Sequence, residues 1–164
     1  LCVVDITYVA VSSGWAYLSL VTDAASRMIV GWALNATLAK EGPIEAINMA
    51  LAYYKEHGVD LSRLIHHSDR GVQYCCYEYV ALLQVYSIQI SMMQTGDPLH
   101  NALAERVNNT VKNGWLFDTD DKDIEEVRKL TEKAIELYNK VRPHQSLEMR
   151  TPFEEKERLT QTAA

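Results

Sequence analysis

The stretch LCVVDITYV, residues 1–9, decides the fold of this chain. Side chains alternate across a strand, so Val3, Asp5 and Thr7 are predicted to share one face. Apolar residues on both faces are typical of a central strand in a sheet that is covered on both sides. A carboxylate in such a strand is costly unless it is paired or bound to a metal ion. Asp5 therefore predicts a functional site on the central strand.

Two further strands are predicted directly after this one. Residues 15–21 and 28–34 are rich in β-branched, aromatic and aliphatic side chains, and turn-forming segments at 12–14 and 22–27 precede them. Strands joined by such short links usually lie side by side. We therefore expect an antiparallel meander of three strands.

The pattern then changes to a helical period. Apolar residues recur at Ile44, Ile47, Leu51 and Tyr54, after a proline suited to a first turn and before Gly58 as a stop. The remaining elements are predicted, in order, as a strand at 63–67, a helix at 73–85, a strand at 87–91, a loop at 92–98, helices at 99–113 and 121–141, and an irregular tail at 143–164. Residues 1–164 are thus expected to form one α/β domain with a mixed five-stranded sheet, three antiparallel strands and then two parallel ones, and helices on both faces.

Composition agrees with one globular domain in a reducing setting. The 164 residues are 48% hydrophobic and 23% charged, and no apolar run approaches the ~20 residues of a membrane span. The three cysteines fit neither a disulfide framework nor a zinc site, so we expect a cytoplasmic protein. The chain begins inside a predicted strand and without Met, which favours a fragment that starts at a catalytic domain.

The acidity of the chain is local. Its net charge is −6, and residues 118–137 alone hold eight acids against four bases. This run is expected to be a solvated helix face with Val127 and Ala134 turned inward. Nucleic acid is therefore not excluded as a partner, although charge alone does not support it.

Asp69 and Glu105 are the other two candidates for an acidic site. Asp69 directly follows the predicted fourth strand, and Glu105 comes after 35 intervening residues. In an open sheet, sites gather where neighbouring strands part direction, so the three acids are expected to converge. Carboxylate ligands suit Mg²⁺ or Mn²⁺, and two such ions ~3.5–4 Å apart can hold both oxygens of an in-line displacement at phosphorus. A helix N-cap is the structural alternative for Asp69.

The predicted helix at 99–113 has one polar stripe. The 100° step per residue of an α-helix places Glu105 in this stripe with Asn101, Asn108 and Lys112. Lys112 lies two turns beyond Glu105 and could meet a phosphate as a point charge. An ordinary amphipathic surface helix would show the same pattern.

Other polar residues leave two roles open. Arg70 is a candidate for a DNA contact, and it could equally pair with a nearby acid. His66 and His67 point to opposite faces of a strand, which favours packing or hydrogen bonding over a joint metal site. Asp23 and Asp97 stand in turn-rich sequence, where aspartate bonds its own backbone.

Several sequence blocks occur together in a fixed order. They are DITY at 5–8, HHSDRGVQY at 66–74, GDP at 96–98 followed by Asn101, Glu105 and Lys112, YN at 138–139, RPH at 142–144 and TP at 151–152. Together they resemble the catalytic core of bacterial insertion-sequence transposases of the integrase-core, or DDE, group, a core that retroviral integrases share.

The resemblance implies a ribonuclease-H-like fold. It also implies that Asp5, Asp69 and Glu105 are the catalytic, metal-binding triad, with two Mg²⁺ (or Mn²⁺) ions. The implied activity is cleavage at transposon ends and transfer of the 3′-hydroxyl to a target phosphodiester. An upstream DNA-binding region would then be absent from this chain.

Partners follow from the same resemblance. They are double-stranded DNA, both transposon ends and target, and further copies of the protein in a homo-oligomer, without a membrane, at the bacterial nucleoid. The residues expected to contact DNA are Lys112, Asn101, Asn108, Arg70 and Gln73. Tyr138, Asn139, Arg142 and His144 are expected to serve packing and turn bonding more than catalysis. Gly114 stands where the family usually has an acid. The alternatives are a decayed, non-catalytic transposase module and a ribonuclease-H-like nuclease.

Overall fold

The fold is built on one mixed sheet of five strands. The computed structural model describes residues 1–92, 98–116 and 118–162. The sheet order is β3-β2-β1-β4-β5, in which β1, β2 and β3 are antiparallel and β4 and β5 run parallel to β1. The strands are β1 (Cys2–Val11), β2 (Gly14–Asp23), β3 (Ile29–Asn35), β4 (Ile65–Ser68) and β5 (Gln89–Met92). The predicted sheet is therefore confirmed, with β1 at its centre.

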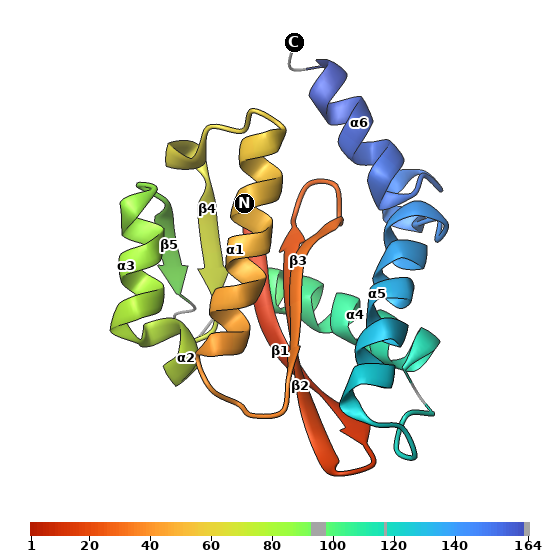
Figure 1. The fold of residues 1–164 in the computed structure, drawn as a ribbon. Helices are drawn as coiled ribbons and strands as arrows, with labels where there is room; N and C mark the ends of the chain where they lie inside the picture. The colour runs from red at the N-terminus through yellow and green to blue at the C-terminus, as the bar shows by residue number, and fades with distance from the viewer. Residues whose placement is uncertain (93–97, 117, 163–164) are drawn as a thin grey trace.

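Helices cover both faces of this sheet (Figure 1). The helices are α1 (Glu41–Glu56), α2 (Val72–Cys75), α3 (Tyr77–Val85), α4 (Pro98–Trp115), α5 (Ile124–Lys140) and α6 (Pro152–Thr162), with 3₁₀ turns η1 (Leu61–Arg63) and η2 (Gln145–Leu147). Helix α1 lies in front of the sheet in this view, and α4 crosses behind it. Within the described residues, no helix is both long enough and apolar enough to cross a lipid bilayer.

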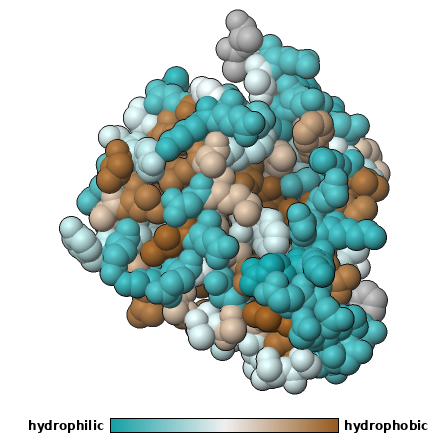
Figure 2. Space-filling view, in the orientation of Figure 1, coloured by the Kyte–Doolittle hydropathy of each residue, from teal (hydrophilic) through white to brown (hydrophobic). Residues whose placement is uncertain are grey.

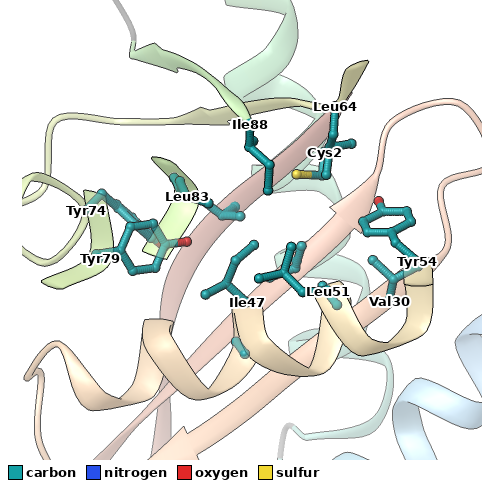
Figure 3. Close-up of a cluster of buried hydrophobic side chains, with 14 of the residues drawn as sticks. Cys2, Val30, Ile47, Leu51, Tyr54, Leu64, Tyr74, Tyr79, Leu83 and Ile88 are labelled. Carbon is teal, nitrogen blue, oxygen red and sulfur yellow. The ribbon is translucent and has the colours of Figure 1, made fainter. Parts of the chain in front are cut away.

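Each face of the sheet has its own hydrophobic core, because side chains alternate along β1. Cys2 and Val4 pack in the core that α1 covers, whereas Val9 and Val11 pack in the core of α4 and α5. Figure 3 shows the first core, in which Ile47 of α1 points toward the sheet. Odd-numbered residues of β1 therefore face α4, and Asp5 is one of them.

Helix α1 approaches the sheet closely at Gly31 of β3. A Cβ atom at this position would overlap the carbonyl oxygen of Ala46 and lie 2.8 Å from the amide nitrogen of Ala50. Both alanines are buried, at 1% and 0% exposure. Gly31 thus allows helix and strand backbones to pack with almost no side chain between them.

The predicted helix at 73–85 is wrong in one respect, since it is two helices. Cys76 is extended, with φ −68° and ψ 150°, and separates α2 from α3. Tyr74 and Tyr79 are both buried, at 3% and 1% exposure. In an unbroken helix, residues five apart point about 140° away from each other. The break at Cys76 lets both rings enter the same core (Figure 3).

The prediction of an irregular tail at 143–164 is also wrong, because α6 occupies Pro152–Thr162. Thr151 Oγ1 accepts the backbone N–H of Glu154 at 3.2 Å, and Glu154 Oε2 accepts that of Thr151 at 2.7 Å. This is a capping box, and Pro152 suits the first helical turn. The T-x-x-E signal was present in the sequence, but two nearby prolines outweighed it.

A buried ion pair joins α6 to the sheet. Lys156 Nζ lies 3.0 Å from Asp23 Oδ2, and both side chains are largely shielded from solvent. Asp23 also accepts the backbone N–H and the hydroxyl of Ser26, each at 2.9 Å. The turn-bonding role predicted for Asp23 is confirmed, whereas Asp97 lies outside the described residues.

The acidic run before and within α5 is a solvated surface, as predicted. Asp123 caps α5 and forms a capping box with Glu126. Val127 and Ala134 are buried, at 0% and 1% exposure. Figure 2 shows hydrophilic residues gathered over α5, while hydrophobic residues interrupt the polar surface nearer α1 and α3.

Candidate active site

The register of β1 and β4 brings the first two acids together. These strands are parallel, with Val3 opposite His67. Two residues further along each strand direction come Asp5 and Asp69. Because side chains two apart share a face, both carboxylates are placed on the α4 side, at the point where β4 ends. The charge of Asp69 accordingly raises the pKa of Asp5.

Asp5 is held from above by α4. Its Oδ2 accepts a hydrogen bond from Nδ2 of Asn108 at 2.6 Å. Burial is the main cause that raises the pKa of Asp5 to about 6. The charges of Asp69 and then Glu105 raise it further, whereas hydrogen bonds from the Ile6 backbone and from Asn108 oppose the shift. Asp5 is therefore a strained carboxylate, as its position in the sequence predicted.

Asp69 is exposed and bonds the loop that leads into α2. Its Oδ1 accepts the backbone N–H of Gly71 at 2.8 Å. Gly71, not Asp69, is the N-cap residue of α2. A Cβ atom at Gly71 would lie 2.9 Å from Asp69 Oδ1, so the absence of a side chain there leaves room for the carboxylate. The N-cap alternative for Asp69 is thus replaced by an Asx turn.

Glu105 lies on the exposed side of α4, one turn before Asn108. Its charge acts on Asp5, which places all three predicted acids within electrostatic range of one another's site. Among the residues that the structure describes, however, no three His, Cys, Asp or Glu side chains are close enough together to hold a metal ion. Three carboxylates without a cation repel one another, which disfavours a closed cluster.

The oxygen atoms around Asp5 nevertheless fit a hard cation. Asn108 is buried at 5% exposure, and its Oδ1 has no hydrogen-bond partner in the described part of the chain. A buried amide oxygen and carboxylates are the donors that Mg²⁺ and Mn²⁺ prefer. The i, i+3 spacing of Glu105 and Asn108 could have suggested from sequence that one helix face serves Asp5.

The residues predicted to contact DNA have different environments. The burial of Asn108 argues against the direct DNA contact that we predicted for it. Gln73 Nε2 donates to the carbonyl oxygen of Leu38 at 3.0 Å, so this side chain supports the loop before α1. Arg70 is exposed and Lys112 is half-buried on α4. The side chain of Asn101 lies outside the described residues.

The two histidines before Asp69 have separate partners. His66 is fully buried, its Nε2 lies 2.9 Å from the hydroxyl of Tyr79, and burial lowers its pKa to about 4. His67 Nδ1 lies 3.0 Å from Ser91 Oγ of β5. Hydrogen bonding and packing, the role favoured from sequence, describe both residues.

The YN and RPH blocks connect α5 to the edge of the sheet. The side-chain amide of Asn139 accepts the backbone N–H of Ile29 and donates to its carbonyl oxygen, both at 2.9 Å. Because β3 is an edge strand, this amide pairs with backbone groups that no sixth strand covers. Tyr138 is buried and meets the ring of His144 edge-on, at 4.9 Å between centroids. The packing and bonding roles predicted for these residues are confirmed.

The five-stranded sheet with two aspartates at adjacent strands defines a ribonuclease-H-like α/β domain. Models of the integrase core domain match residues 1–98 and 86–152 of the chain. This chain therefore belongs to the integrase core family.

Similar curated proteins include a "Putative transposase for insertion sequence element IS986/IS6110" of Mycobacterium tuberculosis, 36% identical over 88% of this chain and 53% of that protein. Another is the "Insertion element IS600 uncharacterized 31 kDa protein" of Shigella sonnei, 35% identical over 99% of this chain and 58% of that protein. The chain thus spans about half the length of these relatives.

Solved retroviral structures share the fold. The HTLV-2 integrase catalytic core domain in complex with magnesium matches with a TM-score of 0.68 and 18% identity, over 93% of each chain. The catalytic core domain of BIV integrase matches with a TM-score of 0.66 and 14% identity, over 98% of this chain and 97% of that one. The predicted ribonuclease-H-like fold is confirmed.

Proposed function

We propose that this chain is the catalytic domain of a transposase that cleaves DNA at transposon ends and transfers the 3′-hydroxyl to a target phosphodiester. The observation that carries this proposal is the placement of Asp5 and Asp69 side by side by the parallel register of β1 and β4, with Glu105 acting on Asp5 from α4. Family membership and relatives named as transposases support the same reaction class.

We propose further that Asp5, Asp69 and Glu105 hold Mg²⁺ or Mn²⁺. When bound, two such ions would stabilise the charge on the attacking and leaving oxygens at phosphorus. The raised pKa of Asp5 supports a cation here, because a positive charge would offset both the burial and the repulsion by the other two acids. Asn108 would orient the carboxylate of Asp5 through its amide.

Double-stranded DNA is the proposed substrate. Lys112 and Arg70 would contact its phosphates, Lys112 from the stripe of Glu105 and Arg70 from the loop beside Asp69. A homo-oligomer would bring two DNA ends together, and the HTLV-2 core, which shares this fold, is known in dimeric and trimeric forms.

The test uses the full-length protein that contains this chain, labelled transposon-end DNA and Mg²⁺ or Mn²⁺. Asp69→Asn should reduce both nicking and joining to background, because it removes a ligand charge at an exposed position. Asp120→Asn, an exposed aspartate in the loop before α5, is the matched control and should retain activity.

Three results would contradict this proposal in different ways. Equal nicking and joining by wild type and Asp69→Asn would exclude the assigned site. Hydrolysis of an RNA–DNA hybrid without any DNA joining would identify a nuclease on the same fold. DNA binding without any metal-dependent chemistry in the wild type would identify a non-catalytic module.

A further inference from the structure

A second polar site lies on the other side of α4. A cavity of about 870 Å³ opens between α4, the turn from β2 to β3 and the segment that follows α5. Arginines from each of these three elements line it, namely Arg27, Arg106 and Arg142, and His144 lies among them. The nearest arginine pair in sequence is 36 residues apart, so no local pattern predicts the cluster.

The positive charge of this cavity is not compensated by the chain. No acid is among its lining residues, and none of the three guanidinium groups forms an ion pair with an acid in the described part of the chain. Their field reaches His144, whose pKa is lowered by burial and by the charges of Arg142 and Arg27. A chain with a net charge of −6 thus keeps one concave, uniformly basic surface.

His144 adds an unused hydrogen-bonding group. Its Nε2 is buried and has no hydrogen-bond partner among the described residues. The ring is fixed edge-on against buried Tyr138. An imidazole nitrogen held in this way, beside planar guanidinium forks, is suited to the oxygen atoms of a phosphate group.

The cavity is connected to the acidic site over the surface of α4. At 100° per residue, Glu105 and Arg106 lie on either side of the exposed ridge of this helix. A shallow depression crosses that ridge and is lined by Glu105 and Arg106 together with Ala102, Asn109 and Thr110. Three of these residues, Ala102, Arg106 and Thr110, also line the basic cavity.

We propose that the basic cavity binds the sugar–phosphate backbone of duplex DNA next to the segment that reaches the acids. This inference rests on the proposed function, since it takes DNA as the substrate of the acidic site. Arginine forks bind phosphate oxygens in a bidentate manner, and such contacts position a duplex without reading its sequence. The apolar walls at Leu103 and Val107 suit the sugar between two phosphates.

The binding test compares two charge-matched triple variants of the full-length protein. Arg27→Gln/Arg106→Gln/Arg142→Gln removes the cavity charge, whereas Arg63→Gln/Lys129→Gln/Lys133→Gln removes three exposed charges elsewhere. Fluorescence anisotropy with a labelled 30-base-pair duplex is measured over a salt series. We expect the cavity variant to bind at least about tenfold more weakly and to lose about 0.9 of salt slope per phosphate contact, while the control keeps most of both.

A third variant separates charge from geometry. Arg27→Lys/Arg106→Lys/Arg142→Lys keeps the charges but not the planar forks, so it should retain the salt slope and lose part of the affinity. Arg106 and Arg142 are exposed and Arg27 is half-buried, so all variants should keep the thermal midpoint of the wild type, which is measured in parallel.

The outcomes distinguish this inference from the proposed function. If the cavity and control variants bind the duplex equally while Asp69→Asn abolishes joining, the inference fails and the proposed function stands. If Asp69→Asn joins DNA like wild type, the proposed function fails, whatever the arginine variants do. If the imidazole resonances of His144 respond to inorganic phosphate but not to the duplex, the cavity is a free-anion site and the DNA assignment is overturned.

Discussion

Replacing Asp5 by asparagine should stabilise the protein at neutral pH when no divalent cation is present. Most substitutions in a folded core destabilise, so the sign of this effect is itself diagnostic. Asparagine keeps the size of the side chain and an oxygen that can accept from Asn108, whose amide now lies 2.6 Å from Asp5. What it removes is the buried negative charge.

The magnitude follows from the pKa of Asp5, which burial and the neighbouring acids raise to about 6. An unfolded chain holds the proton of an aspartate only up to about pH 4. Between these values the folded state binds more protons, so stability falls as the pH rises from about 4 to about 6 and is then level. A shift of about two pKa units corresponds to about 3 kcal/mol, which Asp5→Asn should recover at pH 7 and not below pH 4.

Urea unfolding followed by tryptophan fluorescence, at several pH values between 4 and 8 and with EDTA present, measures this difference. Asp120→Asn is the control and should change stability by no more than about 0.5 kcal/mol at any pH. Added Mg²⁺ should stabilise the wild type more than Asp5→Asn, because only the wild type has the full set of carboxylates. A variant that is less stable than wild type at pH 7, or equally stable at every pH, would refute the reasoning.

Three further predictions concern the scaffold, and thermal or urea unfolding measures each of them. Gly31→Ala should cost about 3 kcal/mol because its methyl group would overlap the backbone of α1, while Gly114→Ala, with nothing within 4 Å, should gain up to about 1 kcal/mol; equal effects would contradict the close approach. Asn139→Leu should cost about 2–4 kcal/mol because it leaves the backbone N–H and carbonyl of Ile29 unpaired, and a loss below 1 kcal/mol would show that water replaces the amide. Thr151→Ala should cost about 1 kcal/mol through loss of the cap of α6, whereas Thr160→Ala, inside α6, should have a smaller effect.

The sheet and its central acid could be predicted because they depend on local patterns. Apolar alternation and short turns identify three antiparallel strands, and a carboxylate inside the first of them is an energetic exception that requires a partner. The convergence of Asp5 and Asp69 needs one fact that the sequence does not state, namely the parallel register of Val3 with His67. Once that register is known, the alternation of side chains places both acids on the same face.

Features that depend on tertiary packing could not be predicted in the same way. The break at Cys76 exists because Tyr74 and Tyr79 are both buried on one side, and burial is not visible in the residues between them. The hydrogen bond from Asn108 to Asp5 joins residues 103 apart. The capping box at Thr151 differs from these cases, because its signal is local and was available in the sequence.

The rotation of α4 about its own axis relates the two sites proposed on it. Val107 and Val111 are buried, at 2% and 0% exposure, in the core that covers this face of the sheet. Each residue step turns the helix by 100°, so a shift of one residue would carry Glu105 away from Asp5 and press Arg106 into the core. Burying an unpaired guanidinium is far more costly than any gain such a shift could bring. Core packing therefore fixes both the acidic side and the basic side of α4, which explains how a helix with so polar a surface can position opposite charges on its two flanks.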